Sequence, residues 1–573
     1  MLFIRLLTSC LLLFSNPEEI IKDKNTFISP MKIPLALSAN FGELRIDHYH
    51  SGVDIKTQGV TGKEVVAPSE GYVYRISISP GGFGKALYLR HPSGYSTVYG
   101  HLDKFIPEIQ EYVISQQYEK RNFTVNLYPP REKFAFRQGD LIAYSGNSGG
   151  STGPHLHYEV RRSENENPVN PLLFDFGTGD DLNPIMERIY FYPVGKNSTI
   201  NGETRPKRVN LTGGHGIYFL PAGEEIKISG QAGLGIKAYD LLNDSYNKCA
   251  AYSIELRADS VTVFSYVMDE FSYAESRYIN SHIDYETYIR ERTYVERAFI
   301  LPNDRLSTYK SNINRGIINF TENKEYNLEL IVSDIHNNKS VLSFKVRGDS
   351  LRSFPGRKTP ENLSAVMPYN RSNRFRAEGV TLTVPPGALY DTLFFEYLRK
   401  PGNSDMLSDV HQIHNIYTPL HKGYSLSIKP TNIPTGKEAK LLLVQMSEDF
   451  RKSAVSSRYS EGYVTGDVLS FGMFFVGIDT IPPGIYTNGL IDGSDLSGKK
   501  ELRIRIDDNL AGIKSYDPQI DGKWALFEYD QKNSVLIYQF DPKRIEKGIM
   551  HSLSLKVSDN KDNVSTCQLS FRW

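Results

Sequence analysis

Residues 146–160 read G-N-S-G-G-S-T-G-P-H-L-H-Y-E-V, and this stretch decides how the fold is interpreted. A loop of Gly, Ser, Asn and Pro residues ends at Pro154, and polar and apolar residues alternate after it. This alternation predicts a β-strand, on which residues two apart share a face. His155 and His157 therefore point to the same side, directly after a glycine-rich loop. Two neighbouring imidazoles fit a catalytic or metal site, and on their own they also fit a pair of surface histidines.

The length and composition indicate several β-rich domains. The chain has 573 residues, too many for one hydrophobic core, and it contains 36 Tyr and 29 Phe. Short alternating runs of aromatic and β-branched residues favour a mostly β protein. The 66 Lys and Arg residues balance the 66 Asp and Glu residues, and no basic run is present. We therefore expect no nucleic-acid partner.

The first residues predict export. One Arg precedes a short apolar run that turns polar at Ser15, which is typical of a secretory signal peptide over residues 1–16. The run is short for a membrane span, and no later segment has about 20 consecutive apolar residues. We expect an exported protein in the periplasm, in the cell envelope or outside the cell, with no transmembrane span. Residues 7–10, L-T-S-C, also fit a lipoprotein box, so a lipid anchor at Cys10 is an alternative.

A second group of polar residues lies at 47–55, D-H-Y-H-S-G-V-D-I. His50 and Asp54 stand four residues apart, and the Gly and Val between them predict a loop that enters a strand. If the two side chains converge, they offer one nitrogen and one oxygen to zinc, and His157 is the candidate third ligand. His48 competes with His50 for this role, and the spacing alone does not decide between them.

Histidines are concentrated in this part of the chain. Short strands separated by turn residues follow, and the runs at 85–91 and 95–102 flank P-S-G as a hairpin would. His101 lies at the end of the second run. Six of the 13 histidines fall between His48 and His157. A functional site is the simplest cause of this density.

Three motifs in this region point to a known family: H-S-G-V-D at 50–54, Y-G-H-L at 99–102 and H-L-H-Y-E at 155–159. A-P-x-x-G at 67–71 and G-D-x-I-x-x-S-G at 139–146 lie between them. With these motifs, the region from about residue 33 to 174 resembles the LytM/lysostaphin-type zinc metallopeptidases, peptidase family M23.

The resemblance implies a fold and a site. It implies an antiparallel β-sheet peptidase domain that holds one zinc ion per chain with His50, Asp54 and His157, and it selects His50 over His48. It also implies that His101 and His155 are the catalytic histidines. The sequence departs from compact family members at residues 103–136, a long insertion where they have a short connection.

The residue types fit the implied chemistry. Three His and Asp ligands leave the fourth zinc position to water, whose pKa falls to about 7. Hydrolysis of an amide also requires a group that manages the proton of this water and a donor to the oxyanion, and His101 and His155 can share these tasks. Glu159 shares the face of His157, where either a partner of an imidazole or a solvated carboxylate fits.

Beyond residue 171 the sequence predicts further β-domains. The run L-x-L-x-V-S-D occurs at 328–334 and again at 553–559, each time followed closely by Asn, and both regions resemble bacterial immunoglobulin-like (Ig-like) domains. Between them, residues 379–389 resemble the signature of ZU5-type β-domains. We interpret His411, His414 and His421 as surface histidines and expect no metal in this half.

These observations give a domain organisation. We expect a mostly β chain with an N-terminal M23-type sheet and about three β-sandwich domains. Cys249 and Cys567 fall in different domains, so no disulfide framework is expected. The predicted segments are a signal peptide at 1–16, the peptidase domain at 28–178, an Ig-like sandwich at 185–350 with a partly helical insertion at 273–306, a ZU5-like β-domain at 353–475, and a C-terminal Ig-like sandwich at 480–573.

Three functions are compatible with the sequence. The first is a secreted zinc-dependent endopeptidase that hydrolyses peptide cross-links of peptidoglycan, with the D-alanyl bond to a diamino acid as the expected target. Its β-domains would be spacers or docking surfaces for an envelope protein partner. The second is a catalytically silent cell-wall-binding protein or an activator of another hydrolase, and the third is an extracellular peptidase that acts on proteins. The complete set of motif histidines favours the first.

Overall fold

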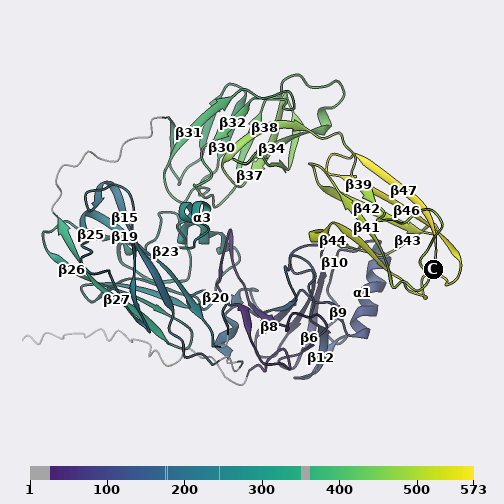
Figure 1. The fold of residues 1–573 in the computed structure, drawn as a ribbon, viewed down its shortest axis with the longest axis horizontal. Helices are drawn as coiled ribbons and strands as arrows, with labels where there is room; N and C mark the ends of the chain where they lie inside the picture. Colours follow the sequence, from purple (N-terminus) through teal and green to yellow (C-terminus); the bar gives the residue numbers. More distant parts are fainter. Residues whose placement is uncertain (1–25, 175, 177–178, 244, 350–361) are drawn as a thin grey trace, which may run out of the picture.

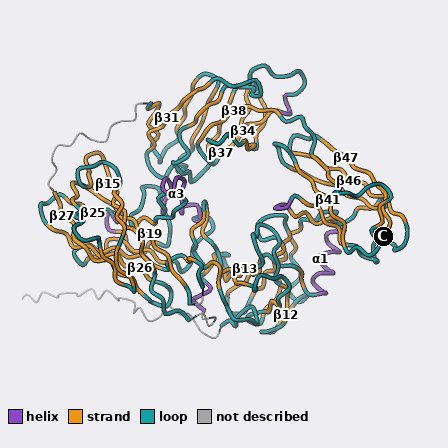
Figure 2. Tube along the Cα trace, in the orientation of Figure 1, coloured by secondary structure: helices purple, strands orange, loops and turns teal. Residues whose placement is uncertain are grey.

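The structure is a computed structural model that describes residues 26–174, 176, 179–243, 245–349 and 362–573. The predicted signal peptide and Cys10 lie outside these residues. Among the described residues, no helix is both long and apolar enough to cross a membrane. The sheets fall into four groups along the chain, which we call the first to fourth domains, and strands dominate each of them (Figure 2). The predicted mostly β fold is confirmed, whereas the exact boundaries and the Ig-like assignment stay predictions.

The first domain contains the expected antiparallel sheet. β13 lies near its middle, between β4 and β8, and a small second sheet packs beside it. The large sheet runs in the order β1 (Leu37–Ala39), β4 (Val53–Lys56), β13 (His155–Arg162), β8 (Tyr95–Gly100), β7 (Lys85–Arg90), β6 (Gly71–Ile78) and β10 (Val125–Leu127). The small sheet consists of β5 (Glu64–Val66), β12 (Leu141–Tyr144) and β9 (Lys104–Phe105). A separate two-stranded sheet pairs β2 (Leu44–Arg45) with β3 (His48–Tyr49).

Alternation along β13 explains its place in the domain. Leu156, Tyr158 and Val160 are fully buried in the core of this domain, which leaves His155 and His157 for the opposite face. β13 pairs with β4 and β8 over most of its length, and the short β14 (Pro168–Val169) extends it. The strand and hairpin predicted from the sequence are therefore present.

The predicted insertion contains the longest helix of the described chain. It contributes β9, α1 (Pro107–Lys120), β10 and β11 (Ala135–Phe136) to the first domain. Ile109 and Val113 are fully buried and hold α1 against the domain core. The helix lies beside the fourth domain (Figure 1).

The second domain is one large sheet built on two long strands, β15 and β19. Two short helices, α2 (Ile279–His282) and α3 (Tyr285–Glu291), lie within the predicted insertion at 273–306 and confirm its partly helical character. The main path of the sheet is β16 (Lys207–Asn210), β15 (Ile185–Ile200), β19 (Lys227–Leu241), β27 (Lys339–Asp349), β26 (Glu325–Ser333), β21 (Ser253–Ala258), β22 (Val261–Val267) and β24 (Tyr309–Asn312). Short strands at its margins are β17 (Thr212–Gly214), β18 (Ile217–Phe219), β20 (Lys248–Cys249), β23 (Glu296–Arg297) and β25 (Ile318–Phe320).

The third domain has two sheets that share one core. The first sheet runs β28 (Leu363–Met367), β31 (Leu393–Lys400), β32 (Val410–Ile413), β38 (Gly472–Ile478), β34 (Leu441–Met446) and β35 (Lys452–Val455). The second runs β29 (Asn373–Ala377), β30 (Val380–Val384), β33 (Tyr424–Ile428), β37 (Tyr463–Val468) and β36 (Ser457–Ser460).

The fourth domain also has two sheets around one core. One runs β39 (Gly484–Tyr486), β41 (Glu501–Asp507), β45 (Val535–Gln539) and β44 (Phe527–Asp530). The other runs β40 (Ser494–Asp495), β47 (Val564–Arg572), β46 (Met550–Asp559), β42 (Ile513–Ile520) and β43 (Lys523–Trp524). The two repeated L-x-L-x-V-S-D runs thus lie on β26 and β46. Cys249 and Cys567 are both free.

The first and second domains share apolar core. Phe41 and Tyr49 of the first domain are buried against Phe271 of the second, with ring centroids 5.3 and 5.5 Å apart. In return, Leu242 and Cys249 of the second domain belong to the core of the first. Burial of this kind stabilises the joint by roughly 25 cal/mol per Å² of apolar surface. The two domains therefore form a continuous hydrophobic structure.

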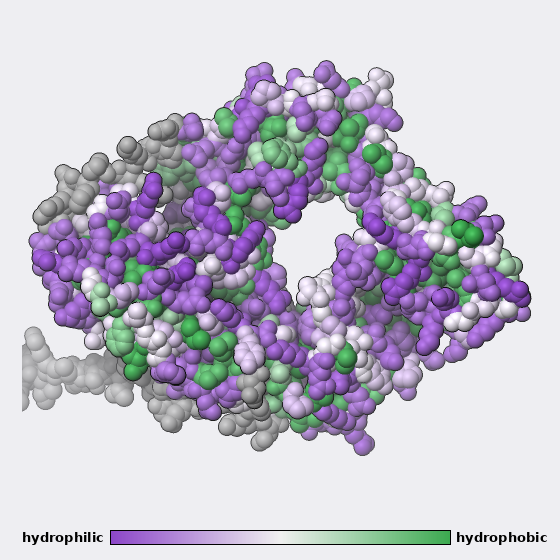
Figure 3. Space-filling view, viewed as in Figure 1, coloured by the Kyte–Doolittle hydropathy of each residue, from purple (hydrophilic) through white to green (hydrophobic). Residues whose placement is uncertain are grey.

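The four domains close into a ring, because the fourth domain returns to the first (Figure 1). The space-filling view shows an opening at its centre (Figure 3). At the closing contact, Glu528 lies 3.0 Å from the Lys85 ammonium and Trp524 packs edge-on against Tyr118 of α1 at 5.3 Å. Arg544 stacks over the same tyrosine ring at 3.9 Å. The insertion thus supplies much of the surface that completes the ring.

Glu528→Lys is predicted to open the ring. The substitution replaces an attraction at 3.0 Å by repulsion from Lys85, which is largely shielded from solvent. Small-angle X-ray scattering should show a larger maximum dimension than for the unmodified chain. Glu501→Lys, in the same domain but bonded to Arg503 and Gln539, is the matched control and should scatter like the unmodified chain. Identical scattering of the two variants would contradict the prediction.

Candidate metal centre and active site

Strand pairing brings the predicted ligands together. In the register of β13 against β4, His157 lies directly opposite Asp54. The chain reaches β4 through a tight approach at Gly52, where an added Cβ would lie 2.3 Å from the Tyr158 carbonyl oxygen. Because the backbone comes this close to β13 at Gly52, His50 lies beside Asp54. On the other side of β13, Gly100 faces His157 and leaves room for its ring.

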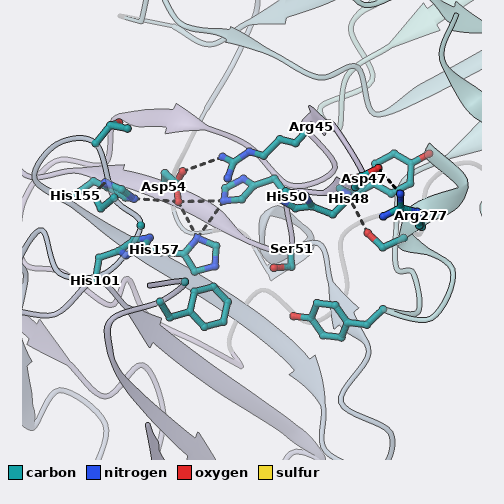
Figure 4. A pocket seen from close by; sticks show the side chains of 18 residues that line it. Arg45, Asp47, His48, His50, Ser51, Asp54, His101, His155, His157 and Arg277 are labelled. Atoms are coloured by element: carbon teal, nitrogen blue, oxygen red, sulfur yellow. Dashed lines mark hydrogen bonds and ion pairs between the residues drawn. The ribbon is translucent and has the colours of Figure 1, made fainter. Parts of the chain in front are cut away.

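His50, Asp54 and His157 form a compact buried cluster (Figure 4). Asp54 Oδ1 lies 3.1 Å from His50 Nε2 and 2.8 Å from His157 Nδ1, and the two imidazole nitrogens are 3.1 Å apart. The three side chains contribute two nitrogens and one oxygen, which is a donor set that zinc accepts. The residues therefore fit the group that the family resemblance implies.

The charges in this cluster favour a cation. Despite its burial, hydrogen bonds to Asp54 and Glu159 raise the pKa of His157 to about 9. Burial also opposes the charge of Asp54, yet the surrounding histidines hold the pKa of this carboxyl well below its usual range. The Asp54 carboxylate thus favours positive charge at the point where the donors converge.

His48, the alternative to His50, lies outside the cluster. Its side chain is exposed, and its Nδ1 contacts the Ile46 carbonyl oxygen at 2.9 Å. His50 is buried, and its Nδ1 lies 2.7 Å from the carbonyl oxygen of Asn40, which fixes the ring with Nε2 toward Asp54. Arg45 also reaches Asp54, at 3.3 Å from Oδ2.

Glu159 supports His157 from behind. Its Oε1 lies 2.9 Å from His157 Nε2, the nitrogen that points away from Asp54, and the carboxylate is fully buried. Although burial disfavours its charge, Arg161 and His157 hold the pKa of Glu159 at about 2. A carboxylate behind a ligating imidazole fixes the orientation and tautomer of the ring. Of the two alternatives left by the sequence, the structure therefore excludes the solvated carboxylate.

His101 and His155 lie together at the edge of the cluster. Their ring centroids are 4.8 Å apart. His101 Nδ1 lies 2.9 Å from the Ser148 carbonyl oxygen, and His155 Nδ1 lies 2.8 Å from that of Gly153. Each ring can donate from Nδ1 to the glycine-rich loop, which leaves Nε2 as the nitrogen for a substrate. Burial, with the neighbouring histidines, lowers the pKa of His101 to about 3, so this imidazole is neutral at pH 7.

A pocket of about 700 Å³ opens over these side chains, and it is not built by the first domain alone. Tyr273, Ser276 and Arg277 of the second domain form part of its lining. Tyr273 also donates to Glu159 Oε2 at 3.1 Å, and Arg277 pairs with Asp47 at 3.2 Å. No sequence motif predicts these contributions, because they depend on how the two domains dock.

Phe83 is a further residue that the sequence analysis missed. Its ring stacks on His157, with centroids 4.9 Å apart and planes inclined by 25°. It lies in the glycine-rich segment 80–84, P-G-G-F-G. The sequence offers one signal for this role: Phe83 is an apolar residue between two glycines, close to the segment that carries His101.

The interpretation of His411 and His414 as surface histidines is wrong. Both are buried in the third domain, where His411 contacts Tyr397 at 2.9 Å and His414 contacts Thr418 at 3.0 Å. Their polar partners come from neighbouring strands and turns, so they are structural residues of the core. His421 is half-buried and stacks on Tyr278 of the second domain.

Comparisons with known proteins bear on the first and third domains. A family model described as Peptidase family M23 matches residues 48–117 and 131–171. The first domain belongs to peptidase family M23. The unmatched residues between these ranges lie in the insertion that carries α1. A second family model, described as Zu5-like domain, matches residues 364–479.

Similar proteins match about a quarter of the chain. An uncharacterized metalloprotease of Haemophilus influenzae is 37% identical over 123 residues, which are 22% of this chain and 20% of that protein. A DD-carboxypeptidase/endopeptidase of Neisseria meningitidis is 30% identical over 159 residues, or 27% of this chain and 30% of that protein. The chain thus spans less than a third of the length of these relatives.

Solved structures likewise match about a quarter of the chain. A zinc containing peptidase from Vibrio cholerae is 25% identical and covers 26% of this chain and 39% of its own, with a TM-score of 0.20. The catalytic domain of lysostaphin from Staphylococcus simulans is 23% identical and covers 24% of this chain and 91% of its own, with a TM-score of 0.19.

Glu159→Gln is predicted to weaken zinc binding without unfolding the domain. Glutamine keeps the shape of the side chain but removes the charge that holds His157 in its tautomer, and loss of such a partner costs about 10–100-fold in metal affinity. Competition with a zinc-binding dye measures the change. Glu64→Gln, an exposed carboxylate of the same domain that lies 3.9 Å from Lys32, is the control and should retain the affinity of the unmodified protein. Equal affinities of the two variants would exclude the role assigned to Glu159.

Proposed function

We propose that the protein is a secreted zinc-dependent endopeptidase that hydrolyses peptide cross-links of bacterial peptidoglycan. The observation that carries the proposal is the convergence of His50, Asp54 and His157 next to the His101–His155 pair in one pocket. The metalloprotease and DD-carboxypeptidase/endopeptidase relatives support it. In this proposal one zinc ion per chain is held by the three buried residues.

The proposed roles follow from the positions of the side chains. Zinc held by this donor set supplies a Lewis acid and lowers the pKa of a coordinated water to about 7. His155 Nε2 lies 3.5 Å from Asp54 Oδ1, so it is close to the donors and is assigned the handling of the proton. His101 lies next to it, with ring centroids 4.8 Å apart, and shares these tasks. Because its Nδ1–H donates to the Ser148 carbonyl oxygen, its Nε2 can first accept a proton and only then donate to the oxyanion that develops on the scissile carbonyl.

The lining of the pocket favours an extended peptide with small side chains. Gly82 and Gly150 line the pocket, and the loops that carry them pack backbone against backbone. At Gly149 an added Cβ would lie 2.3 Å from the Gly84 nitrogen. Peptidoglycan stems and cross-bridges are rich in alanine or glycine, whereas folded proteins seldom offer such a strand. We therefore favour the D-alanyl bond to a diamino acid as the target, in keeping with the DD-endopeptidase relative.

Ligand and catalytic variants are predicted to differ in metal content. His50→Ala and Asp54→Ala should lose both bound zinc and activity, because each removes a donor. His101→Ala and His155→Ala should retain zinc and lose turnover by roughly 10²–10⁴-fold. Elemental analysis and cleavage assays on the same preparations measure both quantities. An empty site in His155→Ala together with a filled site in His157→Ala would reverse the assignment of this pair.

Digestion of defined substrates tests the proposed reaction. Zinc-loaded protein should release monomers from purified cross-linked muropeptide dimers, chelator should abolish the release, and added zinc should restore it. Pentaglycine is the comparison substrate, and mass spectrometry identifies the products. Cleavage of pentaglycine with intact dimers would exclude the D-alanyl target. Cleavage of neither substrate, by protein with full zinc content, would favour a cell-wall-binding protein or an activator of another hydrolase.

A further inference from the structure

Two clusters of three aspartates lie outside the M23 domain sheet. Asp180, Asp240 and Asp334 form the first, with carboxylate oxygens within 4.8 Å of one another. The second cluster consists of Asp479, Asp508 and Asp559, whose carboxylate oxygens also approach within 4.8 Å of one another. No ligand motif in the sequence predicts them.

The two clusters occupy equivalent positions in the second and fourth domains. In each, one aspartate precedes the first strand of the domain, one lies at the end of an early strand and one ends the repeated V-S-D run. Asp180 comes before β15, Asp240 is near the end of β19 and Asp334 directly follows β26. Asp479 comes before β39, Asp508 follows β41 and Asp559 ends β46.

The surrounding hydrogen bonds are also equivalent. Asn338 donates from its side chain to Asp334 Oδ2 at 2.7 Å and to the Asp180 carbonyl oxygen at 2.9 Å. In the fourth domain, Asn563 donates to Asp559 Oδ2 at 2.7 Å and to the Asp479 carbonyl oxygen at 3.1 Å. The same arrangement thus arises twice, at two separate joints of the chain.

Buried carboxylate oxygens in these clusters accept no hydrogen bond. Asp180 Oδ2 and Asp240 Oδ1 are buried without a partner, and the two residues are only 6% and 3% exposed. Asp508 Oδ1 is likewise buried without a partner in the second cluster. Among the described residues, no Lys, Arg or His side chain forms an ion pair within 4.0 Å of these carboxylates. Lys561 near the second cluster and His336 near the first interact with them only at longer range. Buried charge of this kind is costly unless a cation compensates it.

We propose that each cluster binds one calcium ion. The donors are all oxygens, and three carboxylates converge at each position, which suits a hard cation that accepts six to eight oxygens in an irregular site. Mg²⁺ usually takes only one or two carboxylates and retains several waters, so Ca²⁺ fits better. In the first cluster, burial together with Asp334 and Asp180 raises the pKa of Asp240 to about 8, so bound calcium would displace a proton there.

The positions of the clusters define what calcium would do. Asp180 and Asp479 lie in the segments through which the chain enters the second and fourth domains, and the other two aspartates of each cluster belong to the body of that domain. An ion bound by all three ties the entering segment to its domain. Calcium would therefore stiffen the first-to-second and third-to-fourth joints of the ring.

Isothermal titration of the zinc-loaded full chain with CaCl₂, after removal of calcium, tests the proposal. We expect two Ca²⁺ per chain, weaker binding of MgCl₂, and a melting temperature that rises with Ca²⁺. Asp240→Asn and Asp508→Asn should each remove one bound ion, and the double variant should bind none. Asp181→Asn and Asp507→Asn, neighbours that belong to neither cluster, are the matched controls and should bind two. Asp180→Asn replaces Asp240→Asn if the latter does not fold.

Several results would overturn the proposal. They are the absence of calcium binding at millimolar concentration, unchanged stoichiometry in the folded double variant, and magnesium binding as tight as calcium binding. Loss of an ion in Asp508→Asn but not in Asp240→Asn or Asp180→Asn would contradict the first cluster. None of these outcomes depends on the proposed peptidase activity, because the titration reports binding to zinc-loaded protein.

Discussion

The antiparallel pairing of β13 with β4 is the constraint on which the site depends. It sets His157 opposite Asp54, and the pairing of β13 with β8 sets Gly100 on the other flank of the same histidine. Because side chains alternate along a strand, a slip of one residue would turn His157 into the core and Tyr158 toward the pocket. The buried row of Leu156, Tyr158 and Val160 prevents that slip. Apolar packing on one face thus fixes the chemistry on the other.

The second constraint is electrostatic and crosses a domain boundary. Glu159 is fully buried beneath His157, and it is balanced by Arg161 and by hydrogen bonds from Ser51 and Tyr273. Tyr273 comes from the second domain, whose aromatic core also holds Tyr49, the residue next to His50. The environment of the metal cluster is therefore completed only when the second domain is docked. In keeping with this dependence, the inserted segment of the second domain lines the pocket.

Local patterns in the sequence predicted the local parts of the structure. Alternation predicted β13, the turn residues predicted the β7–β8 hairpin, and the glycine before Asp54 predicted a loop that enters β4. The ligand set required the family resemblance, since spacing did not distinguish His48 from His50. Contacts between distant segments could not be predicted, because the periodicity of the sequence indicates only local secondary structure. Tyr273 beneath the site, Trp524 against α1 and the convergence of Asp180 with Asp334 all belong to this class.

Closure of the ring connects the fourth domain to the glycine-rich loop of the first. Lys532, in the turn between β44 and β45, donates to the carbonyl oxygens of Asn147 and Ser151, the latter at 2.9 Å. The same loop presents the Ser148 and Gly153 carbonyl oxygens that hold His101 and His155. The loop is thus held on one side by His101 and His155 and on the other by Lys532 of the fourth domain. Since each joint of the ring limits where Lys532 can lie, the orientation of the two imidazoles depends on domains that contribute no side chain to them.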